Sequence, residues 1–448
     1  MTMMPKKWIF LLGSALLTSS AWALNLSQAY EAALAHDASL KATQAATSAR
    51  QERLPQARSQ LLPNIGLSAS RNRNELETTQ ANVLGQPLTS TSSYGSGNTT
   101  LTLRQPLFRK QQWADYEQAQ FQVADANAVL ERETQNLAVR VSGAYCEALQ
   151  AKEGLNLILA QRTSTTAQWD AAKKRFAAGL GTRTDVDEAQ AALDLNAAQE
   201  LEARQNIAFT QRQLQVMLGN EIQVATDELR GLDAAKLPLN NPTPNDLDTW
   251  IERALENSPE VRSQKAQLES ARLDVEKAQS GHYPTLDAVA QWSRSESENV
   301  TNVNSTYTNR SVGLQLTIPI YAGGQTSSQV RQALSEQERA TQALQALQQD
   351  IAVRVHREFR GITEGVLKIR AIEQAVRSTD QVALSTRRSY EAGVRTLNDT
   401  LNAEQQHAAA RRDLSQARLV YLLSHIRLLA LTGAANTEAI QGFNAWLK

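Results

Sequence analysis

The chain has 448 residues, and its 46 basic side chains equal its 46 acidic side chains in number. This balance argues against a nucleic-acid partner, because nucleic-acid binding usually needs a basic excess. The length is compatible with two or three domains, so the organisation has to be sought in the pattern along the chain.

Residues 1–23 have the pattern of a secretory signal peptide. Two lysines precede an apolar run from Trp8 to Leu17, and Ala21 and Ala23 stand at positions −3 and −1 of a cut after Ala23. The run is too short for a membrane-spanning helix, and no later apolar run approaches the ~18 residues that such a helix needs. We therefore expect an exported mature chain without a transmembrane helix, which excludes a cytosolic cytoskeletal protein.

The remaining chain repeats itself. The turn sequence that ends at Gly179 returns at Gly393, and the one that ends at Gly219 returns at Gly433, in both cases 214 residues later. A period of this length predicts a tandem duplication of one large unit and not a solenoid. The predicted organisation is a signal peptide (1–23), a first repeat (24–236), a linker (237–245), a second repeat (246–433) and a C-terminal tail (434–448).

Each repeat contains a helix that is longer than a globular core can use. Between Arg109 and Ala178 only isolated glycines interrupt the helical pattern, and ~70 helical residues make a rod of roughly 100 Å. Apolar residues recur every seven positions, which indicates a left-handed coiled coil. The recurring positions are Leu130, Leu137, Ala144, Ala151 and Ile158 in the first half and Val355, Ile362, Ile369 and Val376 in the second half.

Glycines end both rods and begin a turn. Gly179 and Gly181 do so in the first half, and Gly393 does so in the second half. A further long helix is expected after each turn, so each half should hold an antiparallel helical hairpin. Taken alone, such hairpins would also fit a stalk-like coiled coil. The second helices are predicted at Asp185–Leu218 and Asn398–Thr432.

Four segments alternate apolar and polar residues with a period of two, which predicts strands with one apolar face. Intervals rich in Asn, Ser and Thr, about 72–98 and 293–310, separate the strands of each pair and are predicted to be loops. This pattern is typical of outer-membrane barrel strands, and an ordinary antiparallel sheet with one wet face gives it too. The apolar positions are Ile65, Leu67 and Ala69; Leu101 and Leu103; Leu286, Ala288, Ala290 and Trp292; and Val312, Leu314, Leu316 and Ile318.

Prolines mark the predicted boundaries between strands and helices, at Pro63, Pro106, Pro284 and Pro319. Four strands cannot close a barrel alone, because bacterial barrels need at least about eight strands and no open edge can face lipid. Several chains would therefore have to share one barrel. A barrel of about eight strands is filled by its own side chains, so three or more chains are favoured for a pore.

Nothing in the sequence signals catalysis or a cofactor. The five histidines lack metal-ligand spacing, and Gly179-Leu180-Gly181 lacks the rest of a phosphate-binding loop. The single cysteine, Cys146, lies in a predicted helix, where it can form no intrachain disulfide and carry no lipoprotein anchor. We therefore predict a protein that is not an enzyme and that needs no cofactor or metal.

Together these features resemble the TolC family of outer-membrane channel proteins over essentially the whole mature chain. The resemblance implies a mixed, mostly α fold and a homotrimer. Each chain would contribute four strands to a shared transmembrane β-barrel, and the helical hairpins would form a periplasmic α-barrel. Outer-membrane lipid, a periplasmic adaptor protein and an inner-membrane pump of the ABC or RND type are the implied partners. The matching motifs are Leu62-Pro63, residues 282–287, residues 318–324 and the two turn sequences that end at Gly179 and Gly393.

The resemblance also implies a gate at the tips of the hairpins. In the family, a tyrosine and an arginine on the second-half turn bond to a Thr-Asp pair on the first-half turn. The matching residues here are Tyr390, Arg395, Thr184 and Asp185. From the residues alone, they would be ordinary solvated turn residues, with the aspartate in the first turn of its helix.

Two aspartates line the narrow end of the pore in close family members. Asp399 matches the first, whereas Asn402 stands in the place of the second. The resemblance therefore implies a pore constriction at these two residues with one carboxylate per chain instead of two. Cation binding at this level should be correspondingly weaker.

The predicted function is that of an exit duct in a tripartite export system, for type I protein secretion, efflux or both. The lack of a lipid-anchor cysteine favours this branch over the acylated multidrug-efflux channels, which are the second candidate. The alternative from another class is a periplasmic coiled-coil structural or adaptor protein without a pore. Such a protein would not need four amphipathic strands.

Overall fold

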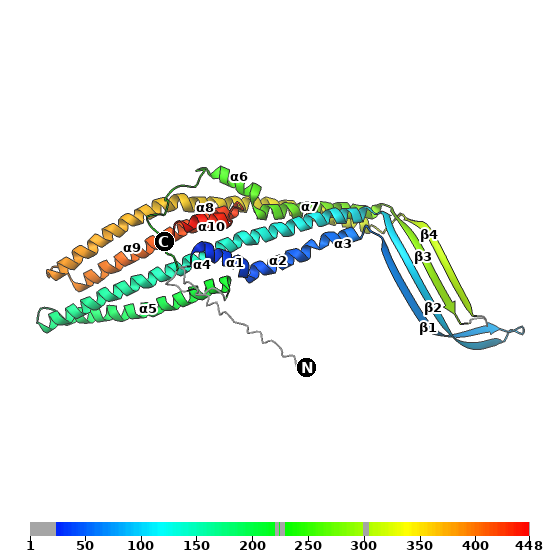
Figure 1. Cartoon of the computed structure of the whole chain (residues 1–448), viewed down its shortest axis with the longest axis horizontal. Coiled ribbons are helices and arrows are strands. Elements are labelled where there is room, and N and C mark those ends of the chain that lie inside the picture. Colours follow the sequence, from blue (N-terminus) through cyan, green and yellow to red (C-terminus); the bar gives the residue numbers. More distant parts are fainter. Residues whose placement is uncertain (1–23, 220–223, 225–228, 299–303, 448) are drawn as a thin grey trace, which may run out of the picture.

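The computed structural model describes residues 24–219, 224, 229–298 and 304–447. The chain is elongated, with a bundle of long helices at one end and a four-stranded sheet at the other (Figure 1). This arrangement confirms the predicted mixed and mostly helical fold class. The predicted signal peptide, 1–23, lies outside the described residues.

Two helical hairpins form the bundle. The helices α4 (Lys110–Ala177) and α8 (Gln325–Glu391) have 68 and 67 residues. Each is followed by a turn and a second helix that folds back along it, α5 (Arg183–Leu218) and α9 (Leu397–Leu431) respectively. The predicted hairpins are therefore confirmed.

Shorter helices flank the hairpins in the same order in both halves. In each half, short helices other than the C-terminal α10 precede a pair of strands and the long hairpin, so the duplication of the sequence is also a duplication of structure (Figure 1). The helix α7 packs against both α4 and α8 and so joins the two halves. The short helices are α1 (Leu26–His36), α2 (Ala38–Gln51), α3 (Arg53–Ser59), α6 (Leu247–Asn257), α7 (Pro259–Gln279) and α10 (Thr437–Asn444), with a 3-10 turn at Ser280–His282.

The middle of the bundle holds the apolar core. Leu137 and Val141 on α4 pack with Leu422 and Ile426 on α9 and with residues of α1, α5 and α10, and these four side chains are fully buried. Leu137 belongs to the seven-residue repeat, and on α8 the repeat positions Val355, Ile362 and Ile369 are buried, so the coiled-coil pattern identified part of the core-facing stripe. Burial of each such side chain stabilises the fold by about 1.5–3 kcal/mol.

A second cluster joins α8 and α9 to α6 and to the predicted linker. Tyr421 on α9 is 1% exposed, and its hydroxyl donates to the carbonyl oxygens of Pro238 at 2.6 Å and Asn240 at 2.9 Å. Leu237 is buried in the same cluster. The linker is therefore held against the outside of the second hairpin by one buried phenol.

The four strands form one antiparallel sheet in the order β1-β2-β3-β4. Their bounds are Asn64–Ala81 for β1, Pro87–Phe108 for β2, Thr285–Ser297 for β3 and Ser305–Thr317 for β4. The two predicted strand pairs thus lie side by side, joined through the pairing of β2 with β3.

The predicted loops at 72–98 and 293–310 are wrong for most of their length. The β1–β2 pairing continues to Ala81 and Pro87, so only residues 82–86 turn there. The strands extend because ladder hydrogen bonds need no apolar side chain, and polar cross-strand pairs support the extension. Asn74 donates to Ser96 at 2.8 Å, and the hydroxyls of Thr79 and Thr89 lie 3.0 Å apart. Between β3 and β4, residues 299–303 lie outside the described part.

The partly buried His425 packs against the C-terminal segment that contains α10. The ring of His425 on α9 lies 4.7 Å from that of Tyr421, 5.5 Å from that of Trp446 and 6.2 Å from that of Phe443, between ring centroids. Its Nε2 atom is buried and has no hydrogen-bond partner in the part of the chain that the structure describes. Burial lowers the pKa of His425 from 6.5 to about 4, because the charged ring would lose its hydration among aromatic groups.

This histidine should make the fold sensitive to acid. An unfolded chain binds the proton below pH 6.5, whereas the folded chain does so only near pH 4, so stability falls as the pH drops through that window. The expected loss at pH 5 relative to pH 7 is about 2 kcal/mol per chain. Urea unfolding followed by circular dichroism at both pH values should show that His425→Leu removes this part of the loss. Equal pH dependence in the variant and the wild type would contradict this assignment.

Candidate functional site

The two faces of the sheet differ in chemistry. The pairing of Leu286 with Leu316 and of Ala288 with Leu314 places aliphatic side chains on one face. Leu314 is 70% exposed and Leu316 is 60% exposed in the single chain. The intervening residues, among them Thr317, Gln315 and Gly313 on β4, lie on the opposite face. A contiguous exposed aliphatic face requires an apolar environment outside the chain.

The edges of the sheet are also open. In the sheet order β1 and β4 are the outer strands, so each has one row of backbone groups without a ladder partner within the chain. An exposed edge of this kind pairs readily with a further strand. An apolar face and two open edges together define a segment of a larger closed sheet.

Exposed aromatic side chains gather where the strands give way to helices. Phe108, Trp113, Tyr283 and Tyr321 are 45–88% exposed. Aromatic girdles of this kind stand at the boundary between lipid and water. The four prolines lie at the same level: Pro63 and Pro284 directly precede β1 and β3, Pro106 lies at the register shift near the end of β2, and Pro319 follows β4.

Both hairpin tips are closed by the same backbone turn. Gly179 and Gly393 have φ values of +70° and +77°, a left-handed conformation that glycine adopts without a steric penalty. In each tip the backbone N–H of the residue directly after the glycine donates a hydrogen bond back to the helix, from Leu180 to Arg175 and from Val394 to Ser389, both at 2.9 Å. Gly181, one residue after Leu180, has no positive φ, and a Cβ there would crowd the end of α4 at 3.1–3.2 Å.

Equivalent capping boxes begin the two returning helices. Thr182 caps α5 and exchanges hydrogen bonds with Asp185, and Thr396 caps α9 and does the same with Asp399. The two boxes lie 214 residues apart, so they are duplicates of one another. The predicted gate carboxylate, Asp185, and the predicted constriction carboxylate, Asp399, therefore share one structural origin.

The predicted constriction residues, Asp399 and Asn402, lie on the first turns of α9. Hydrogen bonds from the backbone and the hydroxyl of Thr396 lower the pKa of Asp399, and the nearby Arg395 adds to this effect. Asn402 is exposed, and its amide donates to Asn398 at 3.2 Å. Asp399 therefore keeps its negative charge at neutral pH, whereas Asn402, one turn later on α9, carries an uncharged amide.

The four predicted gate residues do not meet within one chain. Arg395 lies 4.0 Å from Asp399 of its own helix, and Asp185 is engaged by its capping box. Across the tips, which the structure describes in full, no hydrogen bond or ion pair joins Tyr390 or Arg395 to Thr184 or Asp185. Thr184 is exposed on the first turn of α5.

Other residues hold the two tips together. The guanidinium of Arg175 on α4 lies 4.8 Å from the ring centroid of Tyr390 and donates to the backbone oxygen of Glu391 at 3.0 Å. Nearer the middle, Glu404 on α9 accepts from Ser164 on α4 at 2.9 Å and from Arg387 on α8. Sequence patterns did not reveal the contacts of Arg175 with the second tip or of Ser164 with Glu404, because these join residues more than 200 positions apart on different hairpins.

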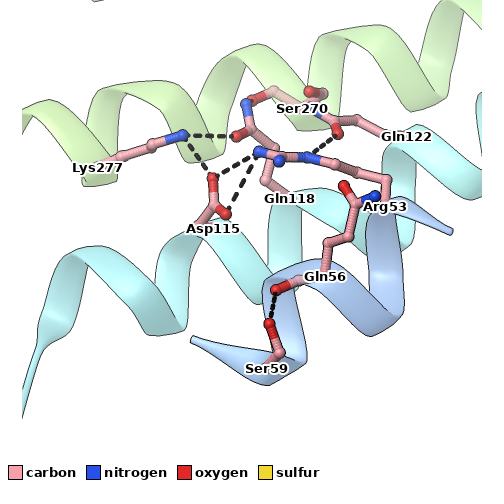
Figure 2. Close-up of polar contacts among 8 residues, drawn as sticks. All are labelled: Arg53, Gln56, Ser59, Asp115, Gln118, Gln122, Ser270 and Lys277. Atoms are coloured by element: carbon pink, nitrogen blue, oxygen red, sulfur yellow. Dashed lines mark hydrogen bonds and ion pairs between the residues drawn. The ribbon is translucent and has the colours of Figure 1, made fainter. Parts of the chain in front are cut away.

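A second polar region lies where the helices meet the sheet. Asp115 on α4 is 4% exposed and accepts from Arg53 on α3 at 3.1 Å and from Lys277 on α7 at 2.6 Å (Figure 2). Close by, Asp287 on β3 is 2% exposed and receives hydrogen bonds from Arg104 and Arg109. The sequence analysis predicted no role for these residues, because the two ion clusters form only when both halves come together.

The described residues contain no group of acidic, histidine or cysteine side chains that could hold a metal ion. Within the same residues, no helix is both long and apolar enough to cross a membrane. A long helical bundle attached to an amphipathic sheet segment is the architecture of an outer-membrane channel subunit.

Comparison with known proteins identifies the family. The sequence profile of the outer membrane efflux proteins matches residues 29–220 and 250–434, one segment in each half. The chain is 32% identical to the proteases secretion protein PrtF of Dickeya chrysanthemi, over 96% of this chain and 92% of PrtF. It is also 29% identical to the outer membrane protein TolC of Vibrio cholerae, over 96% of both chains. The chain belongs to the outer membrane efflux protein family, and as a member of a family of channels it is a transport protein and not an enzyme.

Solved structures show the same fold. The outer membrane protein VceC of Vibrio cholerae superposes with a TM-score of 0.75 at 20% identity, over 92% of this chain and 97% of VceC. The CmeC outer membrane channel of Campylobacter jejuni superposes with a TM-score of 0.75 at 17% identity, over 94% and 89% of the two chains. At these identities the likeness establishes the fold.

The two faces of β4 should respond differently to charge. Leu316→Arg puts a cation on the aliphatic face close to the aromatic girdle, at an expected cost that stays below the about 2–4 kcal/mol of the bilayer midplane. Thr317→Arg, one residue along, puts the same charge on the polar face and should cost much less. The amount of heat-stable protein recovered from outer membranes compares the two variants. Equal recovery would mean that the assignment of the faces is wrong.

Proposed function

We propose that this protein is the outer-membrane exit duct of an export system and that it works as a homotrimer. The observation that carries the proposal is the four-stranded sheet with an aliphatic face and two open edges. In lipid every backbone polar group needs an internal partner, so β4 of one chain has to pair with β1 of the next. Three chains would close a barrel of twelve strands around a pore, with the aliphatic face toward lipid.

The helical bundle would continue the duct into the periplasm. Exposed apolar residues on the hairpins, such as Leu201, Phe209 and Leu367, are 66–67% exposed in the single chain and supply contacts between chains. The signal peptide at 1–23 would direct export to the outer membrane. A periplasmic coiled-coil protein without a pore would leave the aliphatic face of the sheet unexplained.

Type I protein secretion is the favoured system. PrtF is named as a proteases secretion protein, and AprF of Pseudomonas aeruginosa, named as an alkaline protease secretion protein, is 32% identical over 97% of this chain and 89% of AprF. We extend this role to the present chain, with an inner-membrane ABC-type pump and a periplasmic adaptor as partners. Efflux of small molecules with an RND-type pump is the second candidate, because the family also includes efflux proteins.

Assembly tests the proposal directly. Because one sheet cannot close, the folded protein extracted in mild detergent should have three times the mass of the mature chain by light scattering with a detergent correction. A heat-stable, fully folded monomer would contradict the shared barrel. The full-length chain has a mass of 49.3 kDa, so monomer and trimer are well separated.

The gate is proposed to form between neighbouring chains. Arg395 is an exposed side chain with only a long contact to Asp399, so its guanidinium is free to reach an adjacent subunit. Asp185 uses Oδ2 in its capping box, which leaves Oδ1 to accept from Arg395 of the neighbour. Tyr390 and Thr184 would complete the cluster. Each solvated contact would contribute ~1 kcal/mol or less, and the repeated contacts around the ring act together.

Removing the two donors should open the duct. In planar bilayers, the double variant Tyr390→Phe with Arg395→Ser is expected to show a clearly larger single-channel conductance than the wild type, because the closed state loses its contacts between chains. Arg388→Ser, an exposed arginine on α8 that is not part of the proposed gate, is the matched control and should leave conductance unchanged. Unchanged conductance in the double variant would place the constriction elsewhere, with Asp399 as the next candidate.

A further inference from the structure

We propose that the junction between sheet and helices contains an anion-binding pocket that faces the duct. The pocket has a volume of about 440 Å³ and is lined by Arg53, Arg109 and Lys277, together with Asp115, Gln112 and Thr285. The ligand would be a phosphate or carboxylate group of a solute passing through. The placement of the pocket in a duct rests on the proposed function. The pocket itself is formed by residues of one chain and does not depend on that function.

The charges of this region do not cancel. Four cations, Arg53, Arg104, Arg109 and Lys277, surround two carboxylates, Asp115 and Asp287. The excess is two positive charges per chain. The carboxylates are almost completely buried, with side chains 6% and 3% exposed, so they act as fixed supports for the cations.

The cations themselves remain accessible. The side chain of Arg53 is 38% exposed and that of Lys277 is 29% exposed, although both bond to Asp115 (Figure 2). A guanidinium has five N–H donors and an ammonium has three, so each keeps donors for a further acceptor. Arg53 uses Nε toward Gln122 and Nη2 toward Asp115, and its Nη1 has no partner among the contacts of the described residues. This pattern fits an oxyanion that completes the donors' coordination.

The start of α4 adds to the attraction. Its N-cap residue, Arg109, provides no side-chain cap, so the positive end of a 68-residue helix remains open beside the pocket. Gln112 on the first turn lines the pocket, and its Oε1 atom is buried without a partner. Since this acceptor has no partner among the described residues, it can receive a hydroxyl or amine donor of the same ligand.

The register shows which way the pocket faces. Thr285 and Asp287 alternate with Leu286, which belongs to the aliphatic face, so both lie on the polar face together with Arg104. On α4, Asp115 lies two residues from the exposed Trp113, nearly opposite it around the helix. The pocket therefore lies on the side away from the aliphatic face. In a closed ring this side lines the duct, and a lipid headgroup could not reach it.

Titration of the detergent-purified protein with inorganic phosphate, followed by calorimetry, tests the pocket. Phosphate should bind the wild type, and Lys277→Gln should weaken binding about tenfold, the loss expected for one charge-assisted hydrogen bond. Asp115→Asn should have the opposite effect and tighten binding, because it releases both cations from their carboxylate. Lys265→Gln, an exposed lysine on the same helix, should leave affinity unchanged.

The opposite effects of Lys277→Gln and Asp115→Asn on phosphate affinity distinguish a binding site from a cluster that only stabilises the fold. If the cluster only stabilised the junction, Lys277→Gln and Asp115→Asn would both lower the unfolding temperature and neither would change affinity in this order. No phosphate binding in the wild type, or equal affinity in all folded variants, would overturn the proposal. Phospholipid that co-purifies with the wild type and is lost in Lys277→Gln would assign the pocket to a headgroup and overturn its placement in the duct.

A bilayer measurement separates this proposal from the proposed function. In a potassium chloride gradient, Asp115→Asn should shift the reversal potential of the pore toward chloride relative to the wild type. If the protein forms no pore, while Asp115→Asn binds phosphate more tightly and Lys277→Gln more weakly than the wild type, the proposed duct is wrong and the proposed pocket is supported. If the protein conducts, is unaffected by Asp115→Asn and binds no phosphate, the duct stands and the pocket fails.

Discussion

The unpaired backbone at the two edges of the sheet is the constraint on which the rest of the molecule depends. Backbone N–H and C=O groups without partners cost several kcal/mol each in hydrocarbon, so β1 and β4 cannot face lipid as they stand. Closure by further copies of the same chain satisfies all of them with one repeated contact. The long hairpins then stand side by side in a ring, and their Ala-rich seams allow close approach. Oligomerisation is thus required by hydrogen bonding and does not depend on the strength of any single side-chain contact.

Gene duplication gave the two tips the same turn and the same capping box, and their surroundings then made them different. Asp185 and Asp399 each cap the first turn of a helix. Only Asp399 has an arginine four residues earlier in the sequence, Arg395, whose guanidinium lies 4.0 Å from the carboxylate. A capping aspartate is anchored by the backbone and keeps its charge. In the proposed gate it would therefore be a fixed point for a contact that breaks and forms again without unfolding the helix.

The sequence predicted the features that repeat with a regular period. Seven-residue spacing located the buried stripe through Leu137 and Ile362, and glycines located the turns at the tips. The ends of the strands were missed because apolar alternation stops after about Ala69 while hydrogen-bonded pairing continues to Ala81. The bonding partners of Arg175, Asp115 and Asp287 were missed for a different reason. Each depends on which residues of separate helices or strands come together in the folded molecule, and no local pattern encodes that.

The length of the first strand pair has a consequence for the outer surface of the cell. Only the first few residues of β1 carry the aliphatic stripe, and the dozen that follow are polar or charged except for Leu76 and Ala81. At about 3.3 Å per residue this part is a ribbon of roughly 40 Å, and lipid does not stabilise it. In the proposed orientation the ribbon stands out into the external medium, where antibodies and phage meet it before any other part of the protein. Its sequence is therefore free to change under selection from outside, while the aliphatic stripe below it is fixed by the membrane.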